Sequence, residues 1–167
     1  MTTGLAIIAL GSNQGDPRRN VLEAVQRLTT LSAGPLRVSS LWQTSPVDCP
    51  PGSPPFVNAV VALTPLPGET PESLLAKLQG LEKAFGRRPK QVLNEARPLD
   101  LDLIAFGSEQ RGSPELTLPH PRAHLRRFVL SPLAEIAPDL RLPGQPRKVA
   151  ELLAALPAGG EVTKIPF

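Results

Sequence analysis

With 41% hydrophobic and 20% charged residues, this chain of 167 residues has the composition of a globular protein. A chain of this length can bury about two thirds of its unfolded surface without disulfides or a structural metal, and the single Cys49 cannot form an internal disulfide. The net charge of +3 argues against a diffusely basic protein, and no apolar run approaches a membrane-spanning length, so we expect a cytoplasmic protein without membrane contact.

The first predicted elements are a strand and a helix. The apolar run at residues 5–10 ends at Gly11 and predicts a central strand. Asp16 can cap a helix and Pro17 suits its first position, and apolar residues then recur at helical spacing as far as Leu31. The N-terminal part of the chain therefore runs from a strand directly into a helix.

The middle of the chain predicts two strands, a helix and another strand. The β-branched and aromatic stretches at residues 36–44 and 56–63 flank a proline-rich loop and predict antiparallel neighbours. A second helix is predicted from Thr70 as its cap to Gly86 as its end. The strand that follows contains Asp100 and Asp102.

The predicted order is strand, helix, strand, strand, helix, strand, which is the ferredoxin-like βαββαβ pattern of an α+β protein. Such a pattern predicts an antiparallel sheet with both helices packed on one face. Two further helices, one starting near Ser131 and one over residues 147–156, are expected to cover the other face and give an α/β/α sandwich. We expect one domain over residues 1–167.

Asp100 and Asp102 are unusual because they stand in an otherwise apolar strand. Side chains alternate along a strand, so Asp100, Asp102, Ile104 and Phe106 are predicted to share one face. Two carboxylates about 7 Å apart repel each other unless cations lie beside them. Either they are surface carboxylates paired with Arg97, or they bind a divalent ion, for which Mg²⁺ is favoured because it combines a few carboxylates with phosphate oxygens.

The surrounding charge favours a phosphate-rich ligand. Eight of the 18 Lys and Arg residues, but only five of the 15 Asp and Glu residues, fall between residues 87 and 127. The surplus therefore lies around the aspartate pair, where it fits either a polyanionic partner or a merely solvated basic face. The stretch "GSNQGD" lacks the lysine of a phosphate-binding Walker loop, so a different nucleotide site is expected.

Several segments resemble one family, the 6-hydroxymethyl-7,8-dihydropterin pyrophosphokinases of folate biosynthesis. The resemblance extends over nearly the whole chain, in "ALGSNQGDP", "SSLWQTSPV", "FVNAVVAL", "LQGLEKAFGR", "ARPLDLDLIAFG" and "LTLPHPRAHLRRFVLSPLAEIAP". It implies a diphosphokinase that transfers the pyrophosphoryl group of ATP to the hydroxymethyl oxygen of the reduced pterin and releases AMP.

The resemblance also implies residue roles. Asp100 and Asp102 match the ligands of two Mg²⁺ ions, and the catalytic set adds Arg97 and Arg87. The expected ATP-binding residues are Gln79, Glu82, Arg87, Arg88, Arg97, Leu103, Thr117, His120 and Arg126. The expected pterin-binding residues are Thr44, Ser45, Val47, Phe56, Asn58 and Phe128. The polar stretch at residues 86–96 is predicted to act as a lid over ATP, and Trp42 is predicted to lie in the core.

Two other functions are compatible with parts of the sequence. A nucleotide-sugar transferase would use the D-x-D pair but would leave the predicted pocket of aromatic residues and Asn58 unexplained. An RNA-binding ferredoxin-like module would display aromatic side chains on its central strands, whereas these strands are mostly aliphatic. The partners that the family resemblance implies are ATP and the pterin alcohol, without nucleic acid, and the protein is expected to be a monomer.

Overall fold

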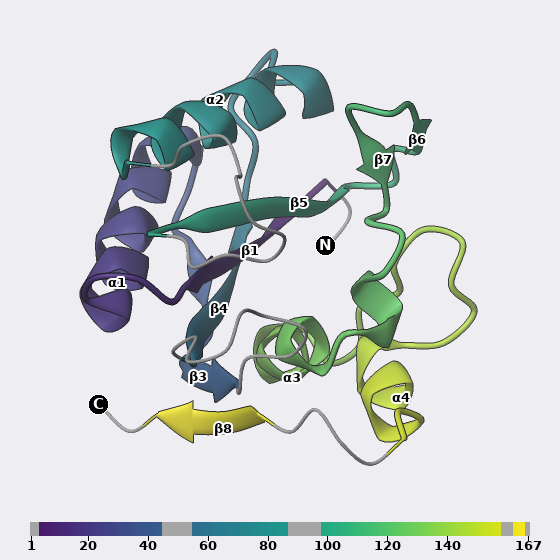
Figure 1. Ribbon diagram of the computed structural model, residues 1–167. Helices are drawn as coiled ribbons and strands as arrows, with labels where there is room; N and C mark the ends of the chain where they lie inside the picture. The colour runs from purple at the N-terminus through teal and green to yellow at the C-terminus, as the bar shows by residue number, and fades with distance from the viewer. Residues whose placement is uncertain (1–3, 45–54, 87–97, 158–161, 166–167) are drawn as a thin grey trace.

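The computed structural model describes residues 4–44, 55–86, 98–157 and 162–165, and Figure 1 shows the arrangement of its elements. In chain order these are β1 (Ala6–Ser12), α1 (Pro17–Leu28), η1 (Thr29–Leu31), β2 (Arg37–Val38), β3 (Leu41–Thr44), β4 (Phe56–Leu63), α2 (Pro71–Ala84), β5 (Asp100–Phe106), β6 (Arg111–Gly112), β7 (Thr117–Leu118), η2 (Ala123–Leu125), α3 (Arg127–Ile136), α4 (Val149–Ala154) and β8 (Val162–Ile165).

The main sheet has the order β5-β1-β4-β3-β8, with each neighbouring pair antiparallel, and β2 also pairs with β4. The first four strands of this order, together with α1 and α2, form the predicted ferredoxin-like pattern. Two features were not predicted from the sequence. The strand β8 extends the sheet beside β3, and β6 and β7 form a separate small hairpin.

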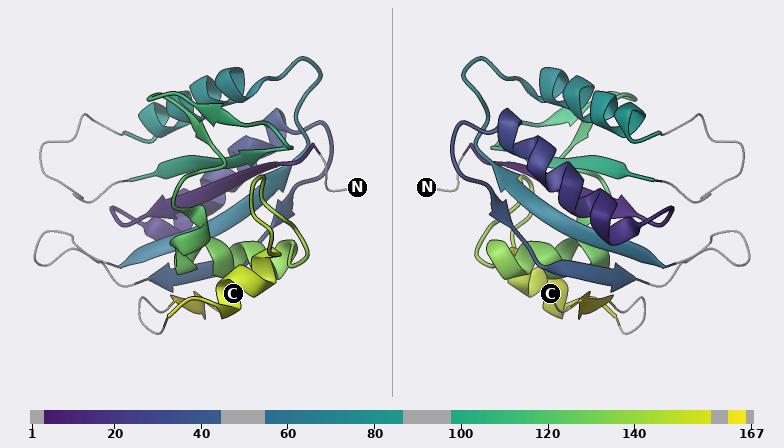
Figure 2. Two further views of the ribbon diagram at one scale, coloured as in Figure 1. Left: turned by 90° about the vertical axis from the view of Figure 1, so that its right-hand side faces the viewer. Right: turned by 90° about the vertical axis from the view of Figure 1, so that its left-hand side faces the viewer.

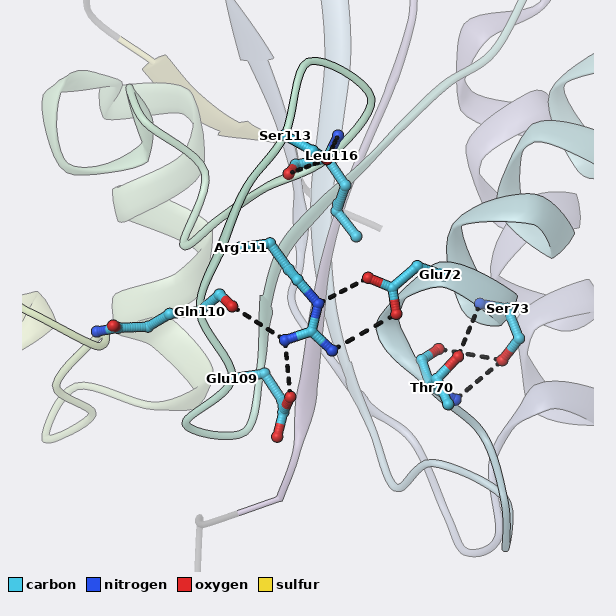
Figure 3. Close-up of polar contacts among 8 residues, drawn as sticks. All are labelled: Thr70, Glu72, Ser73, Glu109, Gln110, Arg111, Ser113 and Leu116. Atoms are coloured by element: carbon cyan, nitrogen blue, oxygen red, sulfur yellow. Dashed lines mark hydrogen bonds and ion pairs between the residues drawn. The ribbon is translucent and has the colours of Figure 1, made fainter.

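The predicted starts of α1 and α2 are confirmed. Asp16 caps α1 by accepting a hydrogen bond from the backbone N–H of Arg19 at 3.3 Å. At the start of α2, the hydroxyl of Thr70 accepts from the backbone N–H of Ser73, and the Ser73 hydroxyl accepts from that of Thr70 (Figure 3). Gly86 follows α2 with a φ of 95°, a conformation that glycine adopts without steric cost.

Helices cover both faces of the sheet, as Figure 2 shows. The side chains of Ala6, Ile8 and Leu10 on β1 point to a core shared with α1 and α2. Ile7 and Ala9 point the other way, to a core shared with α3 and α4. This alternation is the period of two that a strand imposes, and it confirms the predicted α/β/α sandwich.

Three local predictions need correction. The predicted antiparallel pairing of residues 36–44 with residues 56–63 is confirmed, but two short strands make it and not one, because at Ser39 the side-chain hydroxyl accepts the N–H of Val60 in place of a backbone carbonyl. Phe106 packs on the α1 and α2 side, whereas Ile104 packs on the opposite side, because the register between β1 and β5 shifts by one residue at Ile7/Ile8.

The helix predicted near Ser131 begins at Arg127 instead. Pro132, which favours the first turn of a helix, therefore lies in the interior of α3. Five consecutive residues of α3, from Val129 to Leu133, are buried, so burial of this helix against the sheet outweighs the cost of its proline. Within the described parts of the chain, no helix has the length and apolar character needed to cross a membrane.

We predict that Leu133→Ala will lower the free energy of unfolding by about 2–5 kcal/mol, because Leu133 is fully buried between α3 and the sheet. Urea denaturation followed by circular dichroism measures the change. The control is Leu125→Ala, which should change stability by at most about 0.5 kcal/mol because Leu125 is 64% exposed. Equal losses in both variants would show that α3 is not part of the stabilising core.

Candidate active site

Strand pairing places the two predicted binding regions in one row across the sheet. Gly11 on β1 lies opposite Asp100 on β5 and opposite Asn58 on β4, and Asn58 lies opposite Trp42 on β3. Directly opposed residues project from the same face of a sheet, and adjacent strands are about 4.8 Å apart. Asp100 and Asn58 therefore stand on one face with only a glycine between them.

This face is the one that α3 covers. Ile7 and Ala9 belong to the core with α3 and α4, and Gly11 continues the same alternation along β1. Asp102 lies opposite Ala9, so both aspartates project to this face, where each is partly buried. The prediction that Asp100 and Asp102 share one face of their strand is confirmed by the strand pairing.

A side chain at Gly11 would crowd the side chain of Asn58. A Cβ atom added to Gly11 would lie 3.1 Å from Oδ1 of Asn58 and 3.8 Å from the ring of Phe56. Between Asp100 and Asn58, the surface of the sheet therefore consists of the Gly11 backbone, with no side chain above it. From the sequence, Gly11 is predicted only to end a strand. Its place opposite both Asp100 and Asn58 depends on the strand register, which local sequence patterns do not encode.

Asn58 is held in a defined orientation. It is 5% exposed, and its amide nitrogen Nδ2 donates a hydrogen bond of 2.8 Å to the hydroxyl of Thr44, which is also buried. The amide oxygen Oδ1 therefore remains on the side of Gly11, where it can accept a hydrogen bond from a ligand. The structure thus brings together Thr44, Phe56 and Asn58 of the predicted pterin pocket.

Phe128 and Arg126 lie at the start of α3. The guanidinium of Arg126 stands over the ring of Phe128, 5.4 Å from its centroid, and both residues are partly buried. The helix lies against β3 and β4, which carry Thr44, Asn58 and Phe56. Phe128 is therefore on the same side of the sheet as these three residues.

A cleft of about 260 Å³ lies between α2, β5 and the segment around β7. Its walls include four of the predicted metal and nucleotide residues, Asp102, Leu103, Thr117 and His120. The remaining lining residues, which were not predicted from the sequence, are Leu75, Leu101, Glu115, Leu116 and Pro121. Asp102 thus belongs both to this cleft and to the face that carries Asn58.

Arg111 holds the β6–β7 hairpin against α2 (Figure 3). Its Nε donates to Glu72 at 2.6 Å, and its Nη1 donates to Glu109 at 2.8 Å and to the carbonyl of Gln110 at 2.9 Å. The hydrogen bond from Arg111 lowers the pKa of Glu72. Although Arg111 belongs to the basic surplus near the aspartates, its guanidinium is engaged by these acceptors.

His120 is suited to donate a hydrogen bond to an anion. Burial lowers the pKa of His120 from its ordinary value of 6.5, and the charges of Arg126 and Arg122 lower it further, while Asp100 raises it. The backbone N–H of Arg122 donates to Nδ1 of His120 at 3.2 Å. A neutral ring whose Nδ1 accepts a hydrogen bond carries its proton on Nε2, which is then available as a donor.

Gln79 and Glu82 were expected to face the nucleotide together, but they occupy different environments. Gln79 is exposed, whereas Glu82 is 8% exposed and its Oε2 accepts the backbone N–H of Leu101 at 2.8 Å. Leu101 lies between the two aspartates on β5, at the end of the sheet order, where an outward N–H needs a partner. The carboxylate of Glu82 therefore anchors the strand that carries the aspartates.

Trp42 is only partly buried, and the prediction that it lies in the core is wrong, because its indole N–H donates to Glu135 at 3.2 Å.

The remaining predicted site residues and the predicted lid lie outside the described residues. These are Ser45, Val47, Arg87, Arg88, Arg97 and residues 87–96.

The donor set on β5 fits magnesium. Considering only the described ranges of the chain, no three His, Cys, Asp or Glu side chains are grouped in a way that could hold a metal. Two carboxylates on one face suit Mg²⁺, which takes one or two protein carboxylates and completes its shell with substrate phosphates and water. A structural zinc site needs four protein ligands and does not fit these residues.

A ferredoxin-like α/β/α sandwich with paired carboxylates beside a histidine-lined cleft defines a candidate phosphotransferase. Residues 7–138 match the family described as 7,8-dihydro-6-hydroxymethylpterin-pyrophosphokinase (HPPK). The chain belongs to this family, and it is therefore an enzyme of the diphosphotransferase class.

Curated relatives and solved structures agree with this family. A 2-amino-4-hydroxy-6-hydroxymethyldihydropteridine pyrophosphokinase of Pseudomonas aeruginosa is 42% identical over 158 residues, covering 92% of each chain. One of Haemophilus influenzae is 40% identical, covering 83% of this chain and 84% of the relative. The Plasmodium falciparum HPPK-DHPS crystallised with pteroate shares the fold, with a TM-score of 0.70 and 14% identity over 91% of this chain and 42% of that one.

We predict that His120 is neutral at pH 7 and carries its proton on Nε2, which NMR of the imidazole nitrogens measures directly. Its titration midpoint should lie below 6.5. Because the unfolded chain binds this proton more readily, the contribution of His120 should lower the free energy of unfolding as the pH falls below 6.5. The chain has two histidines, so the imidazole signals that remain in the variant His124→Gln belong to His120. A midpoint above 6.5, or a proton on Nδ1, would contradict the assignment.

Proposed function

We propose that this protein transfers the pyrophosphoryl group of ATP to the hydroxymethyl oxygen of 6-hydroxymethyl-7,8-dihydropterin, giving the pterin diphosphate and AMP in folate biosynthesis. The observation that carries the proposal is the row Asp100, Gly11 and Asn58 across three paired strands. It puts a carboxylate suited to metal-bound phosphates about two strand spacings from an amide suited to a heterocycle. Two substrates can therefore meet on one face of the sheet.

The nucleotide is assigned to the cleft between α2, β5 and β7. Apolar side chains of Leu75, Leu103 and Leu116 line this cleft and offer contact to a base, while Thr117 offers a hydroxyl. Asp102 and His120 lie in the same walls, where the triphosphate would approach the metal site. The remaining ATP contacts in the proposal are Gln79, Glu82, Arg87, Arg88, Arg97 and Arg126.

The pterin is assigned to the region between α3 and the sheet. A flat polar heterocycle needs aromatic faces and hydrogen-bonding groups at its edge. Phe56 and Phe128 supply the rings from the sheet and from α3, and Oδ1 of Asn58 supplies an acceptor for ring or amino N–H groups. Thr44, Ser45 and Val47 complete the proposed pocket.

Asp100 and Asp102 would hold two Mg²⁺ ions in this proposal. When bound, these ions neutralise charge on the phosphates and help to orient them. The side chains of this chain do the remaining work by positioning: Nε2 of His120 and the guanidinium of Arg126 donate to phosphate oxygens, while Asn58 and the two rings fix the pterin alcohol for in-line attack on the β-phosphorus. We propose further that the protein acts as a cytoplasmic monomer and binds no nucleic acid.

We predict that Asp102→Asn and Asp100→Asn will each lower kcat by about 100-fold or more, because each removes a negative ligand from the proposed metal site. The pterin affinity should stay within about threefold, since the pocket around Asn58 uses other residues. A coupled assay of AMP release from ATP, with and without the pterin alcohol, measures turnover, and fluorescence titration measures pterin binding.

The control for this experiment is Asp139→Asn. Asp139 is a surface aspartate whose side chain is 84% exposed, beside Lys148 at 3.5 Å, and its replacement should leave both readouts unchanged. Loss of pterin binding with normal turnover of the bound complex would contradict the proposed division of the site. Absence of pterin-dependent AMP release from the unmodified protein would contradict the proposed reaction itself.

A further inference from the structure

Glu135, near the end of α3, connects this helix to two strands of the sheet. Its Oε1 accepts the backbone N–H of Ser40 at 2.7 Å and the indole N–H of Trp42 at 3.2 Å. Its Oε2 accepts the hydroxyl of Ser40 at 2.6 Å and lies 3.4 Å from Nζ of Lys164 on β8. One carboxylate thus contacts donors on Ser40, just before β3, on Trp42 within β3, and on Lys164 of β8.

This carboxylate is held in its charged form. The side chain of Glu135 is 25% exposed. Burial alone would raise the pKa of Glu135, but the hydrogen bonds from Ser40, Trp42 and Lys164 outweigh it and lower the pKa. Hydrogen bonds to a charged group are stronger than those between neutral groups, so this contact adds a directional restraint to the apolar packing of α3 on the sheet.

The same contacts reach the proposed pterin pocket from two directions. Trp42 lies directly opposite Asn58, so the carboxylate that binds its indole fixes the residue beside the Asn58 amide. Phe128 lies on the same helix as Glu135, seven residues earlier and therefore about 10 Å away along the axis. Glu135 consequently ties the element that carries Phe128 to the strand next to Asn58.

We propose that Glu135 is a positioning residue for the pterin site: through Ser40 and Trp42 it sets the spacing between Phe128 on α3 and Asn58 in the sheet. Glu135 itself is not assigned a contact with either substrate. The inference rests on the proposed function, because it takes the space between Phe128 and Asn58 to be the pterin pocket. A flat ring held between an aromatic face and an amide edge is sensitive to this spacing.

The test compares Glu135→Ala and Glu135→Gln with a matched control, Glu69→Ala. Glu69 also has a covered carboxylate, with 3% of its side chain exposed, and it accepts hydrogen bonds from Ser73 and from Lys77. It stands before α2, on the other side of the sheet from α3. The control therefore removes a comparable set of bonds without altering the contact between α3 and β3.

Expected results differ between the two sites. Glu135→Ala should raise the Kd and the KM for the pterin about tenfold, the factor that one charge-assisted hydrogen bond is worth, while kcat at saturating pterin and the Kd for an ATP analogue change by less than about threefold. Glu135→Gln keeps an acceptor for Ser40 and should show a smaller effect. Emission of Trp42, the only tryptophan in the chain, should shift in both Glu135 variants before any ligand is added.

Thermal denaturation of all three variants measures Tm, so that a loss of stability can be distinguished from a loss of pterin affinity. A lowered Tm with unchanged pterin affinity in Glu135→Ala, as expected for Glu69→Ala, would overturn the inference. So would an equal weakening of pterin and nucleotide binding. These outcomes are distinct from failure of the proposed function, which would appear as an unmodified protein that neither binds the pterin alcohol nor releases AMP in its presence.

Discussion

The antiparallel pairing of β1 with β4 on one side and β5 on the other is the constraint on which the candidate site depends. It sets Gly11 opposite both Asn58 and Asp100, so residues far apart in the chain share one row. A shift of one residue in either pairing would turn Asp100 or Asn58 toward the opposite core. A shift of β5 is opposed because it would turn Asp100 and Asp102 into the apolar core with α1 and α2, which now holds Leu101 and Leu103.

The carboxylates of β5 are tolerated in an apolar strand because their strand lies at the end of the sheet order. Leu101 and Leu103 are buried on the α2 side, while Asp100 and Asp102 remain partly buried on the other face. Glu82 adds support by accepting the backbone N–H of Leu101 between them. The position of the two charges is thus fixed by main-chain hydrogen bonds and leucine packing, and their oxygens remain on the side of the cleft and of Asn58.

The two proposed substrate regions are built from different parts of the fold. The hairpin β6–β7, held to α2 by Arg111, closes one side of the cleft that contains Asp102 and His120. The helix α3, held to β3 by Glu135, covers the region of Asn58. Both covering segments follow the βαββαβ core in the chain, so the core supplies the row of residues and the later elements enclose it.

The sequence by itself determined the order of the βαββαβ core, the caps at Asp16 and Thr70, and the common face of Asp100 and Asp102, because each depends on local spacing and turn chemistry. Its motifs also indicated the family, which the family match confirms, and supplied the site residues that the proposed function uses. The tertiary structure alone decided which face of the sheet Phe106 occupies, the position of Gly11 between Asp100 and Asn58, the burial of Glu82 and the hydrogen bond from Trp42 to Glu135. These depend on register and on contacts between distant segments, which local sequence patterns do not encode.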